Sequence, residues 1–173
     1  MQSYALIMTA TKFTVQNNQG ESSPFSMVIK TNPTGKYESI GDSKWLQTLG
    51  ENILSVLGKQ RFGQLASFRA ECPKVLIAGY ITKTMLSGSV GSTTVSKDTV
   101  FCFLNSRPID LPRKFKQLFS DLYKQYNPSS VPYLILNLEV EAGNYDINVS
   151  PDKREVFLNN ESEVVESLKT QLT

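Results

Sequence analysis

The feature that most restricts the fold is a proline inside a stretch that otherwise alternates like a β-strand. Residues 146–150 read Asp-Ile-Asn-Val-Ser, with polar and apolar side chains in turn, and Pro151 follows directly. Since proline has no N–H to donate to a sheet, the strand must end there. Asp152 favours a turn, and residues 156–158, Val-Phe-Leu, form a second extended segment. This pattern predicts two short strands, with Lys153 at the tip of the turn between them.

A lysine held between two anchored strand ends suits a phosphate group. Its ammonium is a compact point charge, whereas the planar guanidinium of arginine matches a carboxylate fork. From spacing alone, a solvated turn at Lys153-Arg154 is the simpler interpretation, and the phosphate-binding one stays open beside it.

Composition excludes several classes of protein. The 173 residues are 40% hydrophobic, carry a net charge of +2 and include no histidine. This length predicts one or at most two domains. The absence of histidine excludes Ser-His-Asp and Cys-His catalysis and the usual zinc sites, and the small net charge restricts any nucleic-acid contact to a local patch. Cys72 and Cys102 are expected as small core residues of a reduced, intracellular protein, with a disulfide between them as the less favoured alternative. No apolar run is long enough for a membrane span.

Strand-like stretches outnumber helical ones along the chain. Besides the two short strands, the predicted strands are 4–15, 25–29, 64–71, 74–82, 99–104 and 133–140. The predicted helices are 45–57, 111–126 and one from Asn160 to Leu172. The first two strands are expected to form a hairpin, and 64–71 and 74–82 an antiparallel pair. The order favours an α+β fold, with a mixed sheet and helices packed mainly on one face.

Helix caps and exposed faces follow from local patterns. The predicted N-caps are Asp42 or Ser43, Asp110, and Asn160 in a capping box with Glu163. Gly58 is expected to end the helix 45–57. One side of strand 133–140 carries Asn137 and Glu139, so that side is expected to face water or a partner. Residues 87–96 are small, polar and nearly uncharged, which predicts a mobile loop. A phosphate-binding loop is disfavoured, because it would end in Gly-Lys-Ser or Gly-Lys-Thr.

Two blocks of sequence resemble the MutL family of DNA mismatch repair proteins. The first block, residues 103–109, reads Phe-Leu-Asn-Ser-Arg-Pro-Ile and is similar to the family's Phe-x-Asn-x-Arg-Pro strand. The second block, residues 146–156, is similar to its Asp-x-Asn-Val-x-Pro-x-Lys-x-Glu-Val segment. The Ser-Pro-Asp-Lys form is closer to the eukaryotic PMS branch than to the MLH branch. The resemblance covers essentially the whole chain.

The resemblance implies a ribosomal-protein-S5-domain-2-like fold and a single transducer-like domain over residues 1–173. Such a domain is the second half of an N-terminal GHKL ATPase region in a larger protein, and the nucleotide-binding and C-terminal domains lie outside this sequence. Lys153 occupies the position of the lysine that contacts the γ-phosphate, so it is the expected catalytic and nucleotide-binding residue. ATP with magnesium is expected in the parent protein. The fragment alone is expected to bind no cofactor or metal, to hydrolyse no ATP and to cut no DNA, although the parent protein has a possible metal-dependent endonuclease in another domain.

DNA binding is the second implied role. Family members bind double- and single-stranded DNA without sequence preference, and Arg113 aligns with a position of their basic groove. Lys114 and Lys116 are added as neighbours, although a solvated helix face accounts for Lys116 equally well and, less readily, for Arg113. Arg107 is expected to anchor its own turn. The resemblance further implies a heterodimer with an MLH-type homologue, a nuclear location and no membrane contact.

Two alternatives share the fold. One is a stand-alone module that binds RNA or the ribosome, in which the second block has no evident role. The other is the transducer domain of a type II topoisomerase, which the first block disfavours.

Overall fold

The computed structural model describes residues 2–16, 28–31, 39–83, 100–126, 128, 131–147 and 154–172. The chain divides into two compact units, Met1–Gly63 and Gln64–Thr173, and each is considered by itself. The single domain expected over residues 1–173 stays a prediction. The loop expected at 87–96 lies outside the described residues.

The first unit contains three helices and one hairpin among its described residues. Its elements are α1 (Gln2–Ile7), β1 (Thr14–Gln16), β2 (Val28–Lys30), α2 (Ser43–Leu57) and α3 (Lys59–Gly63). β1 and β2 pair antiparallel, which confirms the predicted hairpin in a shorter form. The predicted helix 45–57 is confirmed as α2, and Gly58 ends it with a φ of 85°.

The strand predicted from Tyr4 is wrong in its first part, because residues 2–7 form the helix α1. Ala5, Leu6 and Ile7, the last three residues of this helix, are all buried. α1 packs against α2. The buried Asn52 of α2 donates a hydrogen bond of 3.0 Å to the carbonyl oxygen of Leu6. That carbonyl belongs to the last turn of α1 and has no partner within the helix, so the tertiary contact stabilises the helical form.

Asp42 occupies the N-cap position of α2 but does not cap it with its side chain. The N–H of Leu46 donates to the Asp42 carbonyl oxygen at 2.8 Å, as expected at the start of a helix. The carboxylate turns back instead and accepts a hydrogen bond of 3.0 Å from the N–H of Ser39.

The second unit is built on one mixed sheet. Its elements are β3 (Leu65–Cys72), β4 (Val75–Thr82), β5 (Val100–Leu104), β6 (Arg107–Ile109), α4 (Arg113–Tyr126), β7 (Leu134–Val140), β8 (Tyr145–Asp146), β9 (Phe157–Leu158) and α5 (Glu161–Leu172). The five-stranded sheet has the order β3-β4-β7-β5-β6. β5 and β7 are parallel, and the other neighbours are antiparallel.

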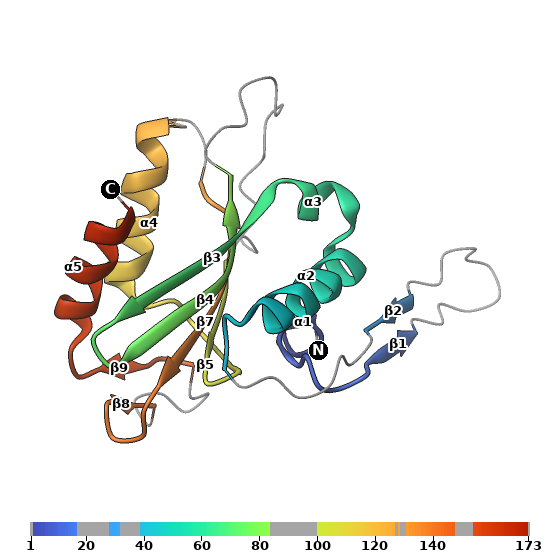
Figure 1. Cartoon of the computed structure of the whole chain (residues 1–173), viewed down its shortest axis with the longest axis horizontal. Coiled ribbons are helices and arrows are strands. Elements are labelled where there is room, and N and C mark those ends of the chain that lie inside the picture. The colour runs from blue at the N-terminus through green and yellow to red at the C-terminus, as the bar shows by residue number, and fades with distance from the viewer. Residues whose placement is uncertain are drawn as a thin grey trace. The chain divides into compact units, whose positions relative to one another are not determined.

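Helices α4 and α5 lie side by side against one face of this sheet (Figure 1). The core between them contains Leu136 and Leu138 from β7, Phe115 from α4 and Leu168 from α5. The observed arrangement confirms the predicted α+β class and the mixed sheet with helices on one face.

The opposite face of β7 is more buried than the sequence predicted. Glu139 is exposed as expected, but Ile135 and Asn137 are buried, with 0% and 1% of their surface exposed. Asn137 is paired in register with Ala78 and Phe103. Its side-chain oxygen accepts a hydrogen bond of 3.0 Å from the N–H of Ser106, whereas its amide nitrogen is buried without a hydrogen-bond partner among the described residues.

Strand β6 was not predicted, because Pro108 within it argues against a strand. β6 is an edge strand of the sheet, where a missing N–H is tolerated. The turn before it has positive φ at both central residues, 48° at Asn105 and 66° at Ser106. Two such residues match the right-handed twist of a two-residue hairpin.

The predicted N-caps of α4 and α5 also differ from the structure. α4 begins at Arg113, two residues later than expected, and the carbonyl oxygen of Pro112 accepts from the N–H of Lys116 at 3.1 Å. Asn160 stands at the N-cap position of α5, but its side-chain amide donates to the carbonyl oxygen of Pro73 at 2.8 Å. That bond attaches the start of α5 to the β3–β4 turn in place of a capping box.

Candidate functional site

The two short strands around the predicted phosphate-binding lysine are paired. β8 and β9 are antiparallel, with Tyr145 opposite Leu158 and Asp146 opposite Phe157. Lys153 itself lies outside the described residues, as do the other residues from 148 to 153. The pairing of β8 with β9 therefore joins the chain on the two sides of these residues. The turn at Pro151 stays a prediction.

The side chain of Asn105, in the first block, anchors the start of the hairpin formed by β8 and β9. Its amide nitrogen donates to the Val140 carbonyl oxygen at 3.0 Å, and its amide oxygen accepts from the Val140 N–H, also at 3.0 Å. The same nitrogen lies 3.4 Å from the hydroxyl oxygen of Tyr145, the residue before the second block. The side chains of Asn105 and Asn137 thus supply hydrogen bonds that anchor the β5–β6 turn, whereas that role was expected of the exposed Arg107.

Asp110, directly after the first block, contacts the other end of the hairpin. Its backbone N–H donates to the Arg154 carbonyl oxygen at 2.9 Å. Its carboxylate oxygen Oδ1 lies 3.1 Å from Nη2 of Arg154, with both side chains more than half exposed. Arg154 is the residue after Lys153. The chain around the first block therefore contacts the chain at both ends of the second.

Sequence reasoning missed this pairing because an aspartate just before a helix is typical of an N-cap. Asp110 and Arg154 carry opposite charges at the ends of the two blocks, and that was the available signal. The ion pair was not predicted because Asp110 and Arg154 lie far apart in the sequence.

The three predicted DNA-binding cations lie in the first turn of α4 but have different surroundings. Arg113 and Lys116 are exposed. The Lys114 ammonium lies 2.7 Å from the Ser162 hydroxyl oxygen and 3.6 Å from a carboxylate oxygen of Glu161, both at the start of α5. Lys114 therefore links the two helices, and part of its charge is already neutralised.

These cations are placed where they do not stabilise the helix. The first turn of α4 contains no acidic residue. The N-terminal end of a helix carries a partial positive charge, which repels nearby cations and attracts anions. The start of α4 is therefore a patch of positive potential suited to phosphate groups.

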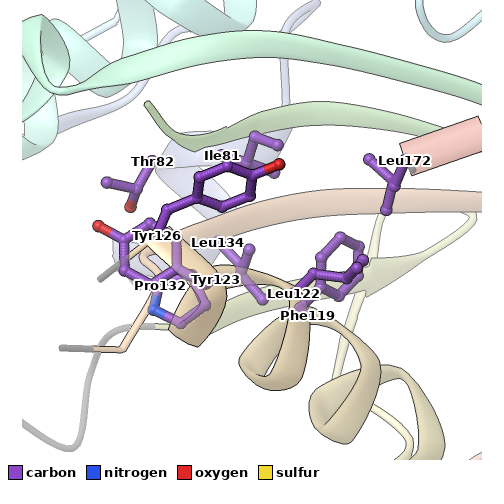
Figure 2. A pocket seen from close by; sticks show the side chains of 9 residues that line it. All are labelled: Ile81, Thr82, Phe119, Leu122, Tyr123, Tyr126, Pro132, Leu134 and Leu172. Carbon is purple, nitrogen blue, oxygen red and sulfur yellow. The ribbon is translucent and has the colours of Figure 1, made fainter. Parts of the chain in front are cut away.

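A separate apolar pocket lies at the other end of α4 (Figure 2). It has a volume of about 80 Å³ and is lined by Phe119, Tyr123 and Tyr126 from α4, with Pro132, Leu134 and Leu172 among the other residues. None of its lining residues is charged at neutral pH, and burial raises the pKa of the Tyr123 hydroxyl. Such a pocket is unsuited to phosphate chemistry.

The cysteines offer no nucleophile. Cys72 and Cys102 are both free thiols, and burial raises the pKa of each. A raised pKa keeps a thiol protonated and unreactive at neutral pH. Within the described ranges, no group of three or more acidic or cysteine side chains is arranged to hold a metal ion, and no helix is long and apolar enough to cross a membrane.

Comparison with known proteins identifies the family. A family model described as "DNA mismatch repair protein, C-terminal domain" matches residues 53–173. The chain belongs to the MutL family of DNA mismatch repair proteins. Its relatives include "DNA mismatch repair protein pms1" of Schizosaccharomyces pombe, which is 32% identical over 172 residues, with 99% of this chain and 19% of that protein aligned.

Other MutL relatives agree. "DNA mismatch repair protein PMS1" of Arabidopsis thaliana is 31% identical over 99% of this chain and 17% of that protein. "Mismatch repair endonuclease PMS2" of Mus musculus is 29% identical over 99% of this chain and 20% of that protein. These relatives confirm the PMS branch, and the chain spans about a fifth of their length.

A solved structure of a DNA repair protein supports the fold. "Crystal Structure of N terminal domain of a DNA repair protein" superposes with a TM-score of 0.74 and 28% identity, covering 99% of this chain and 49% of that chain. This agrees with the predicted ribosomal-protein-S5-domain-2-like fold. Membership of the MutL family argues against a stand-alone RNA-binding module and against a topoisomerase transducer.

Proposed function

We propose that this chain is the transducer half of the N-terminal ATPase region of a PMS-type MutL protein, and that Lys153 contacts the γ-phosphate of ATP. The observation that carries the proposal is the double anchoring of the segment around Lys153. Asn105 holds the chain at its start, and Asp110 holds it at Arg154. The solved relative is titled an N-terminal domain, and this chain covers 49% of it, which supports this location in the parent protein.

A lysine suits the task of sensing a terminal phosphate. Negative charge on the γ-phosphate is stabilised by a cation held in place before the reaction begins. When the phosphate leaves, the attraction disappears, and the domain carrying the lysine is released from the nucleotide. Within the described residues this chain offers no cluster of acidic ligands for magnesium. We therefore assign the magnesium and the attacking water to the nucleotide-binding domain of the parent protein.

Replacing Lys153 tests the proposal. In the full-length protein, Lys153→Ala is expected to lower the kcat for ATP at least about tenfold, because it removes a charge that acts on the transferred phosphate. The thermal unfolding midpoint should stay unchanged. Lys153→Arg keeps the charge but changes its shape and should retain partial activity.

The control is Lys169→Ala, which removes an exposed lysine from α5. This variant should hydrolyse ATP normally. Normal turnover of Lys153→Ala itself would remove Lys153 from the mechanism.

We further infer that Arg113, Lys116 and, more weakly, Lys114 contact the phosphates of double- and single-stranded DNA. The basic first turn of α4 supports this, since its cations have no role in stabilising the helix end. Contacts to phosphates alone are sensitive to salt and do not distinguish sequences.

The remaining inferences concern the parent protein. Since several PMS relatives are named mismatch repair endonucleases, we propose that a further domain of the parent protein carries a metal-dependent nuclease. We also propose a heterodimer with an MLH-type homologue and a nuclear location. Co-purification of the full-length protein with an MLH-type partner tests the proposed heterodimer, and failure to co-purify contradicts it.

A further inference from the structure

We propose that the apolar pocket at the end of α4 binds an unpaired base of single-stranded DNA, and that a basic stripe along the same helix contacts the phosphates of that strand. This inference rests on the proposed contacts of Arg113 and Lys116 with DNA phosphates. It adds to them a binding site for a base at the other end of α4. All residues of this site belong to the part of the chain that the structure describes.

The basic stripe consists of Arg113, Lys116, Ser120 and Lys124. These residues follow one another at intervals of three or four positions, so they lie on one side of α4. The three cations among them are exposed. Tyr123 follows Lys116 by seven residues, which is about two helical turns, so its ring continues the same side of the helix. The stripe therefore leads from the start of α4 to the pocket that Tyr123 lines.

The acidic residue of α4 lies on a different side of the helix. Asp121 is the only aspartate or glutamate in the α4 sequence, and it lines a groove that α4 forms with α5. The other α4 residues at this groove include Lys114, Gln117 and Gln125. The stripe thus carries three positive charges and no carboxylate, which complements a ligand with regularly spaced negative charges.

The pocket at the end of the stripe suits a flat aromatic ring. Tyr123, Tyr126 and Pro132 line it, and its described lining residues carry no charge at neutral pH (Figure 2). Tyr126 is 60% exposed, so most of its ring is accessible for a base to stack on. An enclosed apolar cavity of about 150 Å³ holds benzene. This pocket of about 80 Å³ therefore takes one edge of a base, whose face stacks on Tyr126.

The combination of stripe and pocket favours a single strand of DNA over a duplex. From Arg113 to Tyr126 the helix spans about 20 Å, which corresponds to about six stacked nucleotides at 3.4 Å each. A single strand that follows the stripe brings a base to the pocket, whereas the bases of a duplex are paired and must first be extruded. A proline-rich peptide also fits an aromatic pocket, but it lacks the regular negative charge that the stripe complements.

Fluorescence anisotropy with the full-length protein tests the inference. The three probes are oligothymidine of about twelve nucleotides, a strand of abasic sites of equal length and a duplex of equal length. Tyr126→Ala is expected to weaken the binding of oligothymidine about tenfold, because a base loses its stacking partner. Binding of the other two probes should change less than about twofold, because neither offers an unpaired base. Tyr126→Phe keeps the ring and should bind oligothymidine nearly as well as the unaltered protein.

A tryptophan at the pocket gives a second measurement that does not depend on a loss of binding. The exposed position of Tyr126 has room for the larger ring in Tyr126→Trp. The difference in fluorescence between this variant and the unaltered protein reports on the pocket. Saturating oligothymidine should quench this fluorescence, whereas the abasic strand should not, because only a base stacks on the indole.

The matched control is Phe157→Ala. Phe157 is 62% exposed, close to the value for Tyr126, but it lies on β9 and outside the stripe and the pocket. This variant should bind all three probes as the unaltered protein does.

The outcomes separate this inference from the proposed function. If Arg113→Glu and Lys116→Glu both bind DNA normally, the proposed phosphate contacts fail and the base site falls with them. If these two variants are impaired but Tyr126→Ala binds oligothymidine normally, only the base site is overturned. Equal losses for oligothymidine and the abasic strand, or no quenching in Tyr126→Trp, would also overturn it. Tighter binding of oligouridine than of oligothymidine would assign the pocket to RNA and overturn DNA as its ligand.

Discussion

Gly79 of β4 shows how closely two strands of the large sheet approach each other. It is paired with Leu136 of β7. A Cβ atom added at Gly79 would lie 1.9 Å from the carbonyl oxygen of Ile135. That oxygen belongs to the backbone of a central strand, so it has no freedom to rotate away. Only glycine fits this position without moving the sheet.

Gly79→Ala is therefore expected to destabilise the chain by about 3 kcal/mol, because the strands must separate to admit a methyl group. Urea unfolding of the full chain, followed by circular dichroism, measures the change. Gly63→Ala is the control, since a Cβ there has no atom within 4 Å. It should change stability by less than about 1 kcal/mol. Equal stability of the two variants would show that β4 and β7 are not in such close contact.

At the scale of elements, α4 presents different sides to different partners. Its apolar side is buried against the sheet, with Phe115 at 1% exposed. Lys114 points toward α5 and contacts Glu161 and Ser162 there. Arg113 and Lys116 are exposed. The α4 helix thus contributes to the core, to the contact with α5 and to a positively charged surface.

Charge reversal on α4 tests the DNA interface. Arg113→Glu and Lys116→Glu are each expected to weaken DNA binding about tenfold at low salt and equally for different sequences, since phosphate contacts carry no sequence information. Each should also reduce the salt dependence of binding, by about one unit of the logarithmic slope. Fluorescence anisotropy with two unrelated duplexes and one single strand measures both quantities.

Lys169→Glu on α5 is the charge-matched control and should bind DNA nearly as well as the unaltered protein. Lys114→Ala should lose less affinity than the other two variants, because its ammonium is already engaged by Glu161. If Arg113→Glu binds DNA normally at low salt, the interface lies elsewhere.

At the scale of the whole molecule, the second unit buries several groups that ionise only at alkaline pH. Burial raises the pKa of the Cys72 and Cys102 thiols above their ordinary value of 9.0. It raises the pKa of Tyr80 and Tyr123 above 10.0. All four shifts have the same direction, because a low-dielectric interior disfavours the charged form of each group.

The folded chain should therefore lose stability as the pH rises past about 9. Above the ordinary pKa values the unfolded chain releases protons that the folded chain retains, so unfolding becomes more favourable. Below pH 8 these four groups should contribute no pH dependence, since both states are protonated. Urea unfolding from pH 7 to pH 11 measures the effect. A free energy of unfolding that stays constant over this range would mean that the four groups are accessible to water in the folded state.

The sequence by itself determined the family and those helices and strands that have a regular apolar pattern. Helices α2, α4 and α5 and strands β3, β4 and β7 follow from periodicity, because burying an apolar face requires regularly spaced residues. The two blocks indicated the MutL family because their residues occur together in a specific order. The proline inside a strand pattern also predicted a turn that carries Lys153, and this stays a prediction because residues 148–153 lie outside the described part of the chain.

Only the tertiary structure decided which partners the polar side chains bind. Asp110 has the local pattern of a helix cap, yet it pairs with Arg154, and Asn160 reaches Pro73 instead of closing a capping box. The helix α1 likewise depends on Asn52 of α2. A cap and a long-range contact use the same side-chain atoms and have the same local sequence. The choice between them depends on which distant backbone or charge the fold brings within hydrogen-bonding distance.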